Sequence, residues 1–179
     1  GLLTAYKERF DKDNFIKNLL LDNLLLVDIY NRAKKLHIPV DARRVVLILE
    51  TPPDTDQGAL DNVKGMFSSK SGDFVTAIDE KNIIIVKEIA PGDDARQVDR
   101  IAESVLDVLG RNPENKTHIA YGTIVKELKE VSRSYKEARM ALDVGKIFFE
   151  ERDVIAYSKL GIGRLIYQLP IPLCKMFLK

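Results

Sequence analysis

Residue types that build disulfides and metal sites are scarce in this sequence. The 179 residues include no tryptophan, one cysteine and two histidines. Cys174 has no partner for an internal disulfide, and His37 and His118 lie too far apart in the chain to indicate a metal cluster. This composition argues against a disulfide-stapled secreted scaffold. It predicts a protein of the reducing cytoplasm with no metal or other cofactor.

Long apolar runs and an excess of one charge are also lacking. No run approaches the roughly 20 apolar residues of a membrane-spanning helix, and residues 1–15 are too charged for a secretory signal. The 28 basic and 27 acidic side chains nearly cancel. A chain without a strong positive field does not attract a polyanion. We therefore expect neither a membrane nor nucleic acid as a direct partner of this segment.

The sequence does contain alternating helical and strand-like patterns, over a length suited to one main domain. Helical spacing of apolar residues predicts helices over residues 12–21, 28–36, 55–67, 94–110, 128–142 and 161–169. Apolar and β-branched runs predict strands over residues 45–49, 74–78, 83–86, 118–122 and 153–157. This order predicts an α/β (α+β) fold in which a mixed, mostly antiparallel sheet carries helices on its faces and follows an N-terminal helical pair.

Details of the pattern place individual elements. The continuous apolar run at 45–49 is typical of a central strand covered on both faces. The polar residues 79–82 have the length of a hairpin connection, and residues 153–157 suit a short edge strand. Asp28 is expected to cap the second helix. Residues 23–27 are unusually apolar for a connection, so we expect them to pack against another surface or to form an interface.

Several segments resemble one protein family. The order of elements, with a short charged turn in the hairpin, resembles the palm-like fold of the GGDEF diguanylate cyclases. The residues themselves look more like the central region of sugar-diacid (CdaR/PucR-type) transcriptional regulators, a degenerate relative, over residues 12–23 (KDNFIKNLLLDN), 28–38 and 44–47. Residues 132–142 (SRSYKEARMAL) are similar to that family's Ser-Tyr-x-Glu-Ala-x-x-Ala-Leu helix. Residues 160–170 (LGIGRLIYQLP) resemble the segment that precedes its helix-turn-helix.

The resemblance implies a division of the chain and a role. Residues 1–40 would be an N-terminal helical segment or linker, residues 41–158 a degenerate GGDEF-like domain, and residues 159–179 a helical linker toward a helix-turn-helix domain outside this chain. DNA would be bound by that domain, and a sugar-diacid inducer by an N-terminal module that is also outside this chain. The expected function is that of a non-catalytic regulatory and dimerisation domain, a homodimer, in a bacterial transcriptional regulator of sugar-diacid utilisation.

The residues at the cyclase positions predict a silent active site. A cyclase needs glycines in its hairpin turn, where backbone approaches the nucleotide, followed by acidic residues that hold a metal or activate a hydroxyl. Alignment of the hairpins places Ile78, Asp79 and Glu80 there, and Glu50 falls near the position of a metal-binding aspartate. These three carboxylates are the candidate ligands, but Ile78 obstructs close approach. We predict too few oxygen ligands for a two-metal site, no catalytic residue and no enzyme activity.

Simpler interpretations apply to most of these residues. An acidic pair in a polar hairpin is common in an ordinary solvated turn. His37, at a helix end, is expected to interact with terminal carbonyls, and His118 has no clear chemical role. Tyr135 and Arg139 are spaced i and i+4, so they could bind an anion, but a packing pair on the helix surface is the favoured interpretation.

Two other functions compete with the regulatory one. The domain could sense a nucleotide or small anion in a cleft inherited from a cyclase. It could also be an active cyclase that converts GTP in the presence of magnesium, which the bulky hairpin argues against. Calorimetry with GTP or a cyclic dinucleotide discriminates the first, and product formation discriminates the second.

Overall fold

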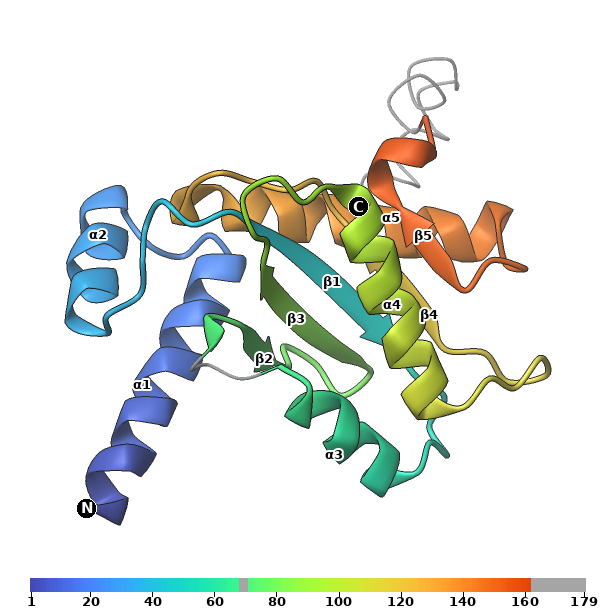
Figure 1. Cartoon of the computed structure of the whole chain (residues 1–179), viewed down its shortest axis with the longest axis horizontal. Coiled ribbons are helices and arrows are strands. Elements are labelled where there is room, and N and C mark those ends of the chain that lie inside the picture. The colour runs from blue at the N-terminus through green and yellow to red at the C-terminus, as the bar shows by residue number, and fades with distance from the viewer. Residues whose placement is uncertain (68–70, 162–179) are drawn as a thin grey trace.

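The computed structural model describes residues 1–67 and 71–161 (Figure 1). Within them, five strands form one sheet in the order β2-β3-β1-β4-β5. All neighbouring strands are antiparallel except β4 and β5, which are parallel. This arrangement confirms the predicted mixed, mostly antiparallel sheet. The strands are β1 (Arg44–Glu50), β2 (Phe74–Thr76), β3 (Asn82–Glu88), β4 (His118–Tyr121) and β5 (Val154–Ala156).

Five α-helices accompany this sheet in the described part of the chain. They are α1 (Leu2–Leu20), α2 (Leu26–Lys35), α3 (Gln57–Gly65), α4 (Ala95–Leu109) and α5 (Val131–Phe148), with short 3-10 turns at Leu128–Glu130 and Tyr157–Lys159. Helix α1 begins well before residue 12, where the sequence predicted its start, because the apolar pattern that faces the core begins only at Phe15. The predicted helix at 161–169 lies outside the described residues apart from its first position.

The start of α2 differs from the prediction. Its N-cap is Leu25, which forms no side-chain cap, so the predicted capping by Asp28 is wrong. Asp28 lies instead inside the first turn, where a carboxylate favours the positive end of the helix dipole. Within the apolar segment 23–27, Leu24 packs against the core, whereas Leu25 and Val27, which is already in the first turn of α2, are 70% and 59% exposed. The connection therefore contributes both to packing and to an exposed apolar surface.

The sheet separates two hydrophobic cores. Helices α1, α2 and α5 cover one face, and α3 and α4 cover the other (Figure 1). Alternating residues of β1 enter the two cores: Val46 and Ile48 face the first, while Val45, Leu47 and Leu49 face the second. All five are fully buried, which confirms the prediction of a central strand covered on both sides.

A β-bulge interrupts the pairing of β1 with the chain that follows β4. The N–H of Gly122 donates to the carbonyl of Val46 at 3.1 Å, and pairing resumes where Arg44 and Val125 exchange two hydrogen bonds of 3.0 and 2.8 Å. Between these points, two residues after β4 face a single residue of β1. An extra residue of this kind leaves backbone groups without their partners in the ladder.

Helix α5 supplies the missing partners. The hydroxyl of Ser134 accepts from the backbone N–H of Val46 at 3.0 Å and donates to the carbonyl of Thr123 at 2.9 Å. Glu137 Oε1 accepts from the Thr123 hydroxyl at 2.7 Å and from its N–H at 3.2 Å. A Cβ on Gly122 would lie 2.2 Å from the carbonyl oxygen of Ser134, so only glycine permits this approach. The Ser-Tyr-x-Glu segment therefore fastens α5 to the sheet.

Candidate functional site

The structure brings two of the three predicted carboxylates to the same end of the sheet. Glu50 is the last residue of β1, and its cross-strand partner is Asn82, the first residue of β3. Asn82 Nδ2 donates to Asp79 Oδ2 at 3.2 Å, which places the hairpin loop next to the end of β1. Glu80 is exposed in that loop. Strand register thus places Glu50 and the loop of Asp79 at the same end of the sheet.

Asp79 is engaged in closing the hairpin. Its Oδ1 accepts from the backbone N–H groups of Lys81 and Asn82, both at 2.9 Å, an Asx-type turn. Partial burial raises the pKa of this carboxyl, but the hydrogen bonds from Lys81 and Asn82 and the positive charge of Arg139 outweigh that effect. The pKa of Asp79 therefore lies below its ordinary value, and the ionised form is the one that shapes the loop.

Cations from α5 neutralise both carboxylates. Lys146 Nζ lies 2.7 Å from Glu50 Oε1 and 2.9 Å from Oε2, and Arg139 Nη2 lies 3.7 Å from Asp79 Oδ2. Asp143 lies one turn from each cation on the same helix. Burial and the nearby charge of Glu50 raise the pKa of Asp143 above its ordinary value, against the lowering effect of Arg139 and Lys146. We call these five residues the α5 charge cluster.

The sequence indicated only part of the role of the α5 cations Arg139 and Lys146. The i, i+4 spacing of Tyr135 and Arg139 was noted, and the structure shows a packing pair: Arg139 Nη2 donates to the Tyr135 hydroxyl at 3.1 Å, with the guanidinium over the ring. Asp143 and Lys146 follow at i+4 and then i+3, a signal that this helix face carries a charged row. The pairing of Lys146 with Glu50 depends on tertiary packing and has no local signal.

Ile78, the residue expected to obstruct the hairpin, points toward the protein interior. Ile78 is half-buried and packs against the core shared by α1, α2 and α5. Beyond β1, the loop is shaped by a turn in which the Thr55 N–H donates to the Pro52 carbonyl at 3.1 Å. The hairpin loop and the loop after β1 are thus each held by internal contacts.

Of the two histidines, His37 lies apart from this cluster, whereas His118, the first residue of β4, is paired with Glu50 across the sheet. His37 follows α2 in a left-handed conformation with φ 59°, and its backbone N–H donates to the carbonyl of Lys34 at 3.3 Å. The carbonyl contact expected at this helix end is therefore made by the main chain of His37. His118 Nδ1 lies 3.2 Å from the carbonyl oxygen of Arg152. Residues 1–67 and 71–161 contain no group of three or more histidine, cysteine or acidic side chains that could hold a metal ion.

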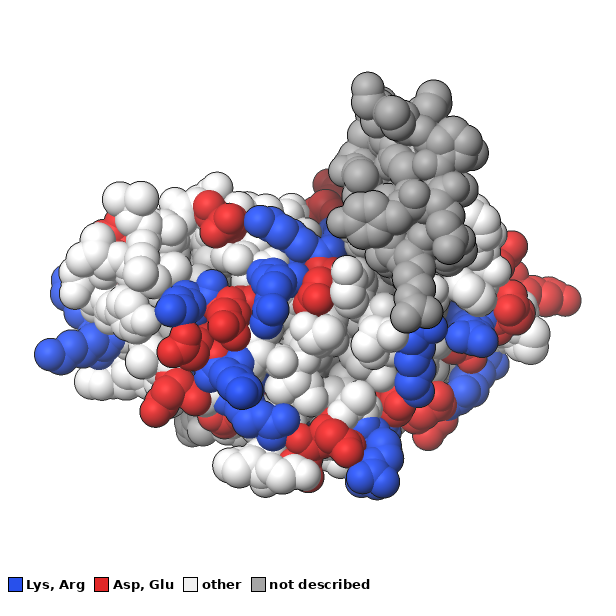
Figure 2. Space-filling view, turned by 90° about the horizontal axis from the view of Figure 1, so that it is seen from above, with Lys and Arg blue, Asp and Glu red and all other residues white. Residues whose placement is uncertain are grey.

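Figure 2 shows acidic and basic side chains interspersed on the face that it displays, in keeping with the nearly balanced composition. In the described part of the chain, no helix combines the length and the apolar character needed to cross a membrane.

Fold and site together define a class and then a family. A mixed five-stranded sheet whose antiparallel β2–β3 hairpin meets the end of a central strand, with helices on both faces, is an α/β domain of palm-like type. The family model described as GGDEF-like domain matches residues 23–144, most of the chain, and the protein belongs to that family. A search of the curated proteins finds no match.

Proposed function

We propose that this chain is a non-catalytic regulatory domain of a bacterial transcriptional regulator that controls the use of sugar diacids or a related carbon source. Its membership of the GGDEF-like family and the segments that resemble CdaR/PucR-type regulators support this proposal. In this proposal the chain acts as a homodimer. A helix-turn-helix domain elsewhere in the protein binds DNA, and an N-terminal module binds the inducer.

The α5 charge cluster is the observation that supports the proposed absence of catalysis. The sequence resemblance aligns Glu50 and Asp79 with acidic positions of a cyclase, and each of them faces a cation of α5, at 2.7 and 3.7 Å. A magnesium ion needs several oxygen ligands in near-octahedral arrangement. To bind here it would have to displace Lys146, and Asp79 would have to leave the backbone N–H groups of the hairpin. The cluster therefore favours a structural role for both carboxylates.

Product analysis tests the absence of catalysis. The protein is incubated with GTP and magnesium or manganese, and the nucleotides are separated by chromatography, beside an active diguanylate cyclase as a positive control. We expect GTP to remain unchanged. Formation of a cyclic dinucleotide and pyrophosphate that stops in a Glu50→Gln variant would overturn the non-catalytic assignment.

The second candidate function is the sensing of a nucleotide or small anion in the same region. It is weaker because the two cations of the cluster are already paired with acidic side chains of this chain. Calorimetry with GTP and with a cyclic dinucleotide decides between the candidates. Heat of binding that weakens in Glu50→Gln or Asp79→Asn variants would support sensing, whereas a flat titration supports the regulatory scaffold.

The exposed apolar residues before and within α2 are the surface on which we base the proposed homodimer. Leu25, Leu26 and Val27 are 70%, 52% and 59% exposed, and Tyr30 and Leu21 are 40% and 44% exposed. Contiguous apolar exposure of this kind marks interaction surfaces. Sedimentation of the wild type should show self-association that is lost in a Leu25→Glu/Leu26→Glu variant. A wild type that sediments as a monomer at every concentration would refute dimerisation through this surface.

A further inference from the structure

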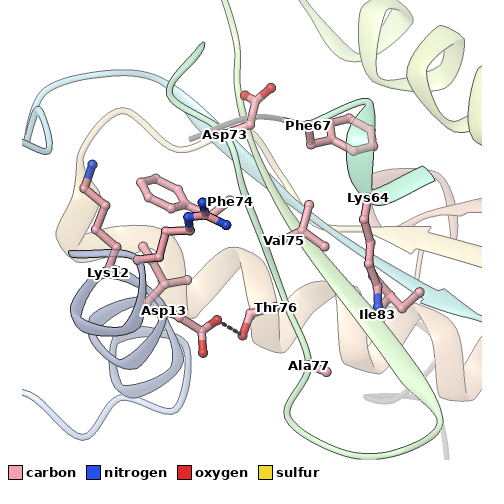
Figure 3. Close-up of a pocket in the computed structure, with 12 residues that line it drawn as sticks. Lys12, Asp13, Lys64, Phe67, Asp73, Phe74, Val75, Thr76, Ala77 and Ile83 are labelled. Atoms are coloured by element: carbon pink, nitrogen blue, oxygen red, sulfur yellow. Dashed lines mark hydrogen bonds between the residues drawn. The ribbon is translucent and has the colours of Figure 1, made fainter. Parts of the chain in front are cut away.

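A pocket lies at the open edge of the sheet, away from the α5 charge cluster. It extends around the outer side of β2, between the C-terminal half of α1 and helix α3, with a volume of about 480 Å³ (Figure 3). This volume falls in the range of roughly 300–1,000 Å³ that is usual for small-molecule sites. Apolar side chains from the sheet edge and from the residues just after α3 form much of its wall, notably Phe67, Phe74, Val75 and Ile83.

Cations from two helices surround this apolar wall. Arg9 and Lys12 come from α1, and Lys64 comes from α3. In Figure 3, Lys12 and Lys64 lie on opposite sides of the β2 edge, with Val75 between them. Lys12 is 3.4 Å from Glu8, whereas Arg9 and Lys64 form no ion pair with any residue of the described ranges. The pocket therefore offers positive charge from both sides.

The two acidic residues of the pocket do not neutralise these cations, because each is engaged elsewhere. Asp13 accepts from the Thr76 hydroxyl at 2.7 Å and pairs with Lys17 at 3.0 Å. Asp73 is buried, pairs with Lys87 at 3.0 Å and accepts from the backbone N–H of Glu88 at 3.0 Å. With both carboxylates satisfied, the charge that faces the pocket without an ion-pair partner among the described residues is positive.

We propose that this pocket binds an organic anion with an apolar body, in the class of medium-chain carboxylates. The hydrocarbon part would cover Val75, Ile83 and the two phenylalanines, and the carboxylate would meet Arg9 or Lys64. Charge complementarity selects an anion, and the apolar wall selects a chain over a polyol, whose hydroxyls would be left without partners there. This site is separate from the cyclase positions, and its ligand does not depend on the role proposed for Glu50 and Asp79.

Binding at this place has a consequence for α1. The C-terminal half of α1 packs in the core through Phe15, Ile16, Leu19 and Leu20, while its N-terminal half extends away from the sheet (Figure 1). A ligand that contacts Arg9 as well as β2 and α3 joins the extending part of the helix to the domain. Occupation of the pocket therefore stabilises α1 against local opening.

The experiment compares probes that share a chain and differ in charge. Decanoate, decyltrimethylammonium and acetate are titrated into the protein by calorimetry, and amide hydrogen exchange in α1 is followed with and without decanoate. We expect saturable 1:1 binding of decanoate alone, with slower exchange in the turns around residue 9. An Arg9→Gln/Lys64→Gln variant should bind about three- to fivefold more weakly, because it removes the exposed charge pair that the carboxylate forms with either cation.

The matched control is Lys126→Gln, which removes an exposed lysine that does not line the pocket and should leave the affinity unchanged. Equal binding of decanoate and decyltrimethylammonium, or an unchanged affinity in the Arg9/Lys64 variant, would overturn the proposal, as would a flat decanoate titration. The GTP assay described above is independent of this outcome, so either conclusion can fail without the other.

Discussion

Replacement of Ser134 by alanine tests how α5 is fastened to the sheet. The hydroxyl satisfies two backbone groups at the bulge, the N–H of Val46 at 3.0 Å and the carbonyl of Thr123 at 2.9 Å. Both Ser134 and Val46 are fully buried, so water does not readily replace the lost partner. A buried donor left without a partner costs about 1–3 kcal/mol. The higher helix propensity of alanine offsets this cost by at most about 0.7 kcal/mol.

The expected net loss is therefore about 2 kcal/mol in the free energy of unfolding. For a chain of this length, that loss lowers Tm by roughly 4–8 °C. Urea titration followed by circular dichroism measures the first quantity and calorimetry the second. Hydrogen exchange should also accelerate locally at the Val46 amide, because its hydrogen bond is the one removed.

Ser132→Ala is the matched control for this experiment. Ser132 lies on the same helix and is only half-buried, so the substitution changes helix propensity without removing the bond to the bulge. We expect its stability to equal or slightly exceed that of the wild type. If Ser134→Ala proved as stable as Ser132→Ala, the hydroxyl would not be needed by the bulge and the reasoning would be wrong.

Three further substitutions test other contacts. A Cβ at Gly145 would lie 2.3 Å from Ile155 Cδ1, so Gly145→Ala should destabilise the protein by about 1–3 kcal/mol in urea titrations, and Ile155→Val in the same chain should restore part of it. Asp56→Ala removes the N-cap bond to Ala59 N–H at 3.0 Å and should cost about 1 kcal/mol, with Asp56→Asn as the near-neutral control. Because the folded-state pKa of Asp79 is lowered, its ionised form stabilises the protein above the ordinary pKa, and this contribution is lost as pH falls through the folded value. Asp79→Asn should therefore lower stability at neutral pH and flatten the acid decline below about pH 4, whereas parallel pH profiles for the two proteins would contradict that role.

The local pattern of the sequence determined much of the fold. The apolar run at 45–49 was sufficient to predict a strand covered on both faces, because only a central strand buries every residue. Both ends of α4 could also be predicted from the sequence. Asp94 caps its start by accepting from the Arg96 N–H at 2.9 Å, and Gly110 ends the helix with φ 78°. These features depend on neighbours in the chain, so composition and spacing reveal them.

The start of the two N-terminal helices was harder to predict. Apolar periodicity marks only the part of a helix that faces a core, so the exposed beginning of α1 left no signal. Asp28 looked like a cap because Asp is favoured at N-cap positions. The chain enters the helix earlier, at Leu25, because the packing of Leu24 in the core sets where α2 begins.

The sequence by itself determined the order of the elements in the described residues and the central strand, and it supplied Glu50, Asp79 and Glu80 as candidate ligands. Only the tertiary structure decided what those residues contact. Glu50 and Lys146 are 96 positions apart, and the hydroxyl that completes the bulge comes from 88 positions beyond Val46. Such pairs are fixed by how α5 packs across β1 and β4, a consequence of burying two apolar faces together that no local pattern encodes.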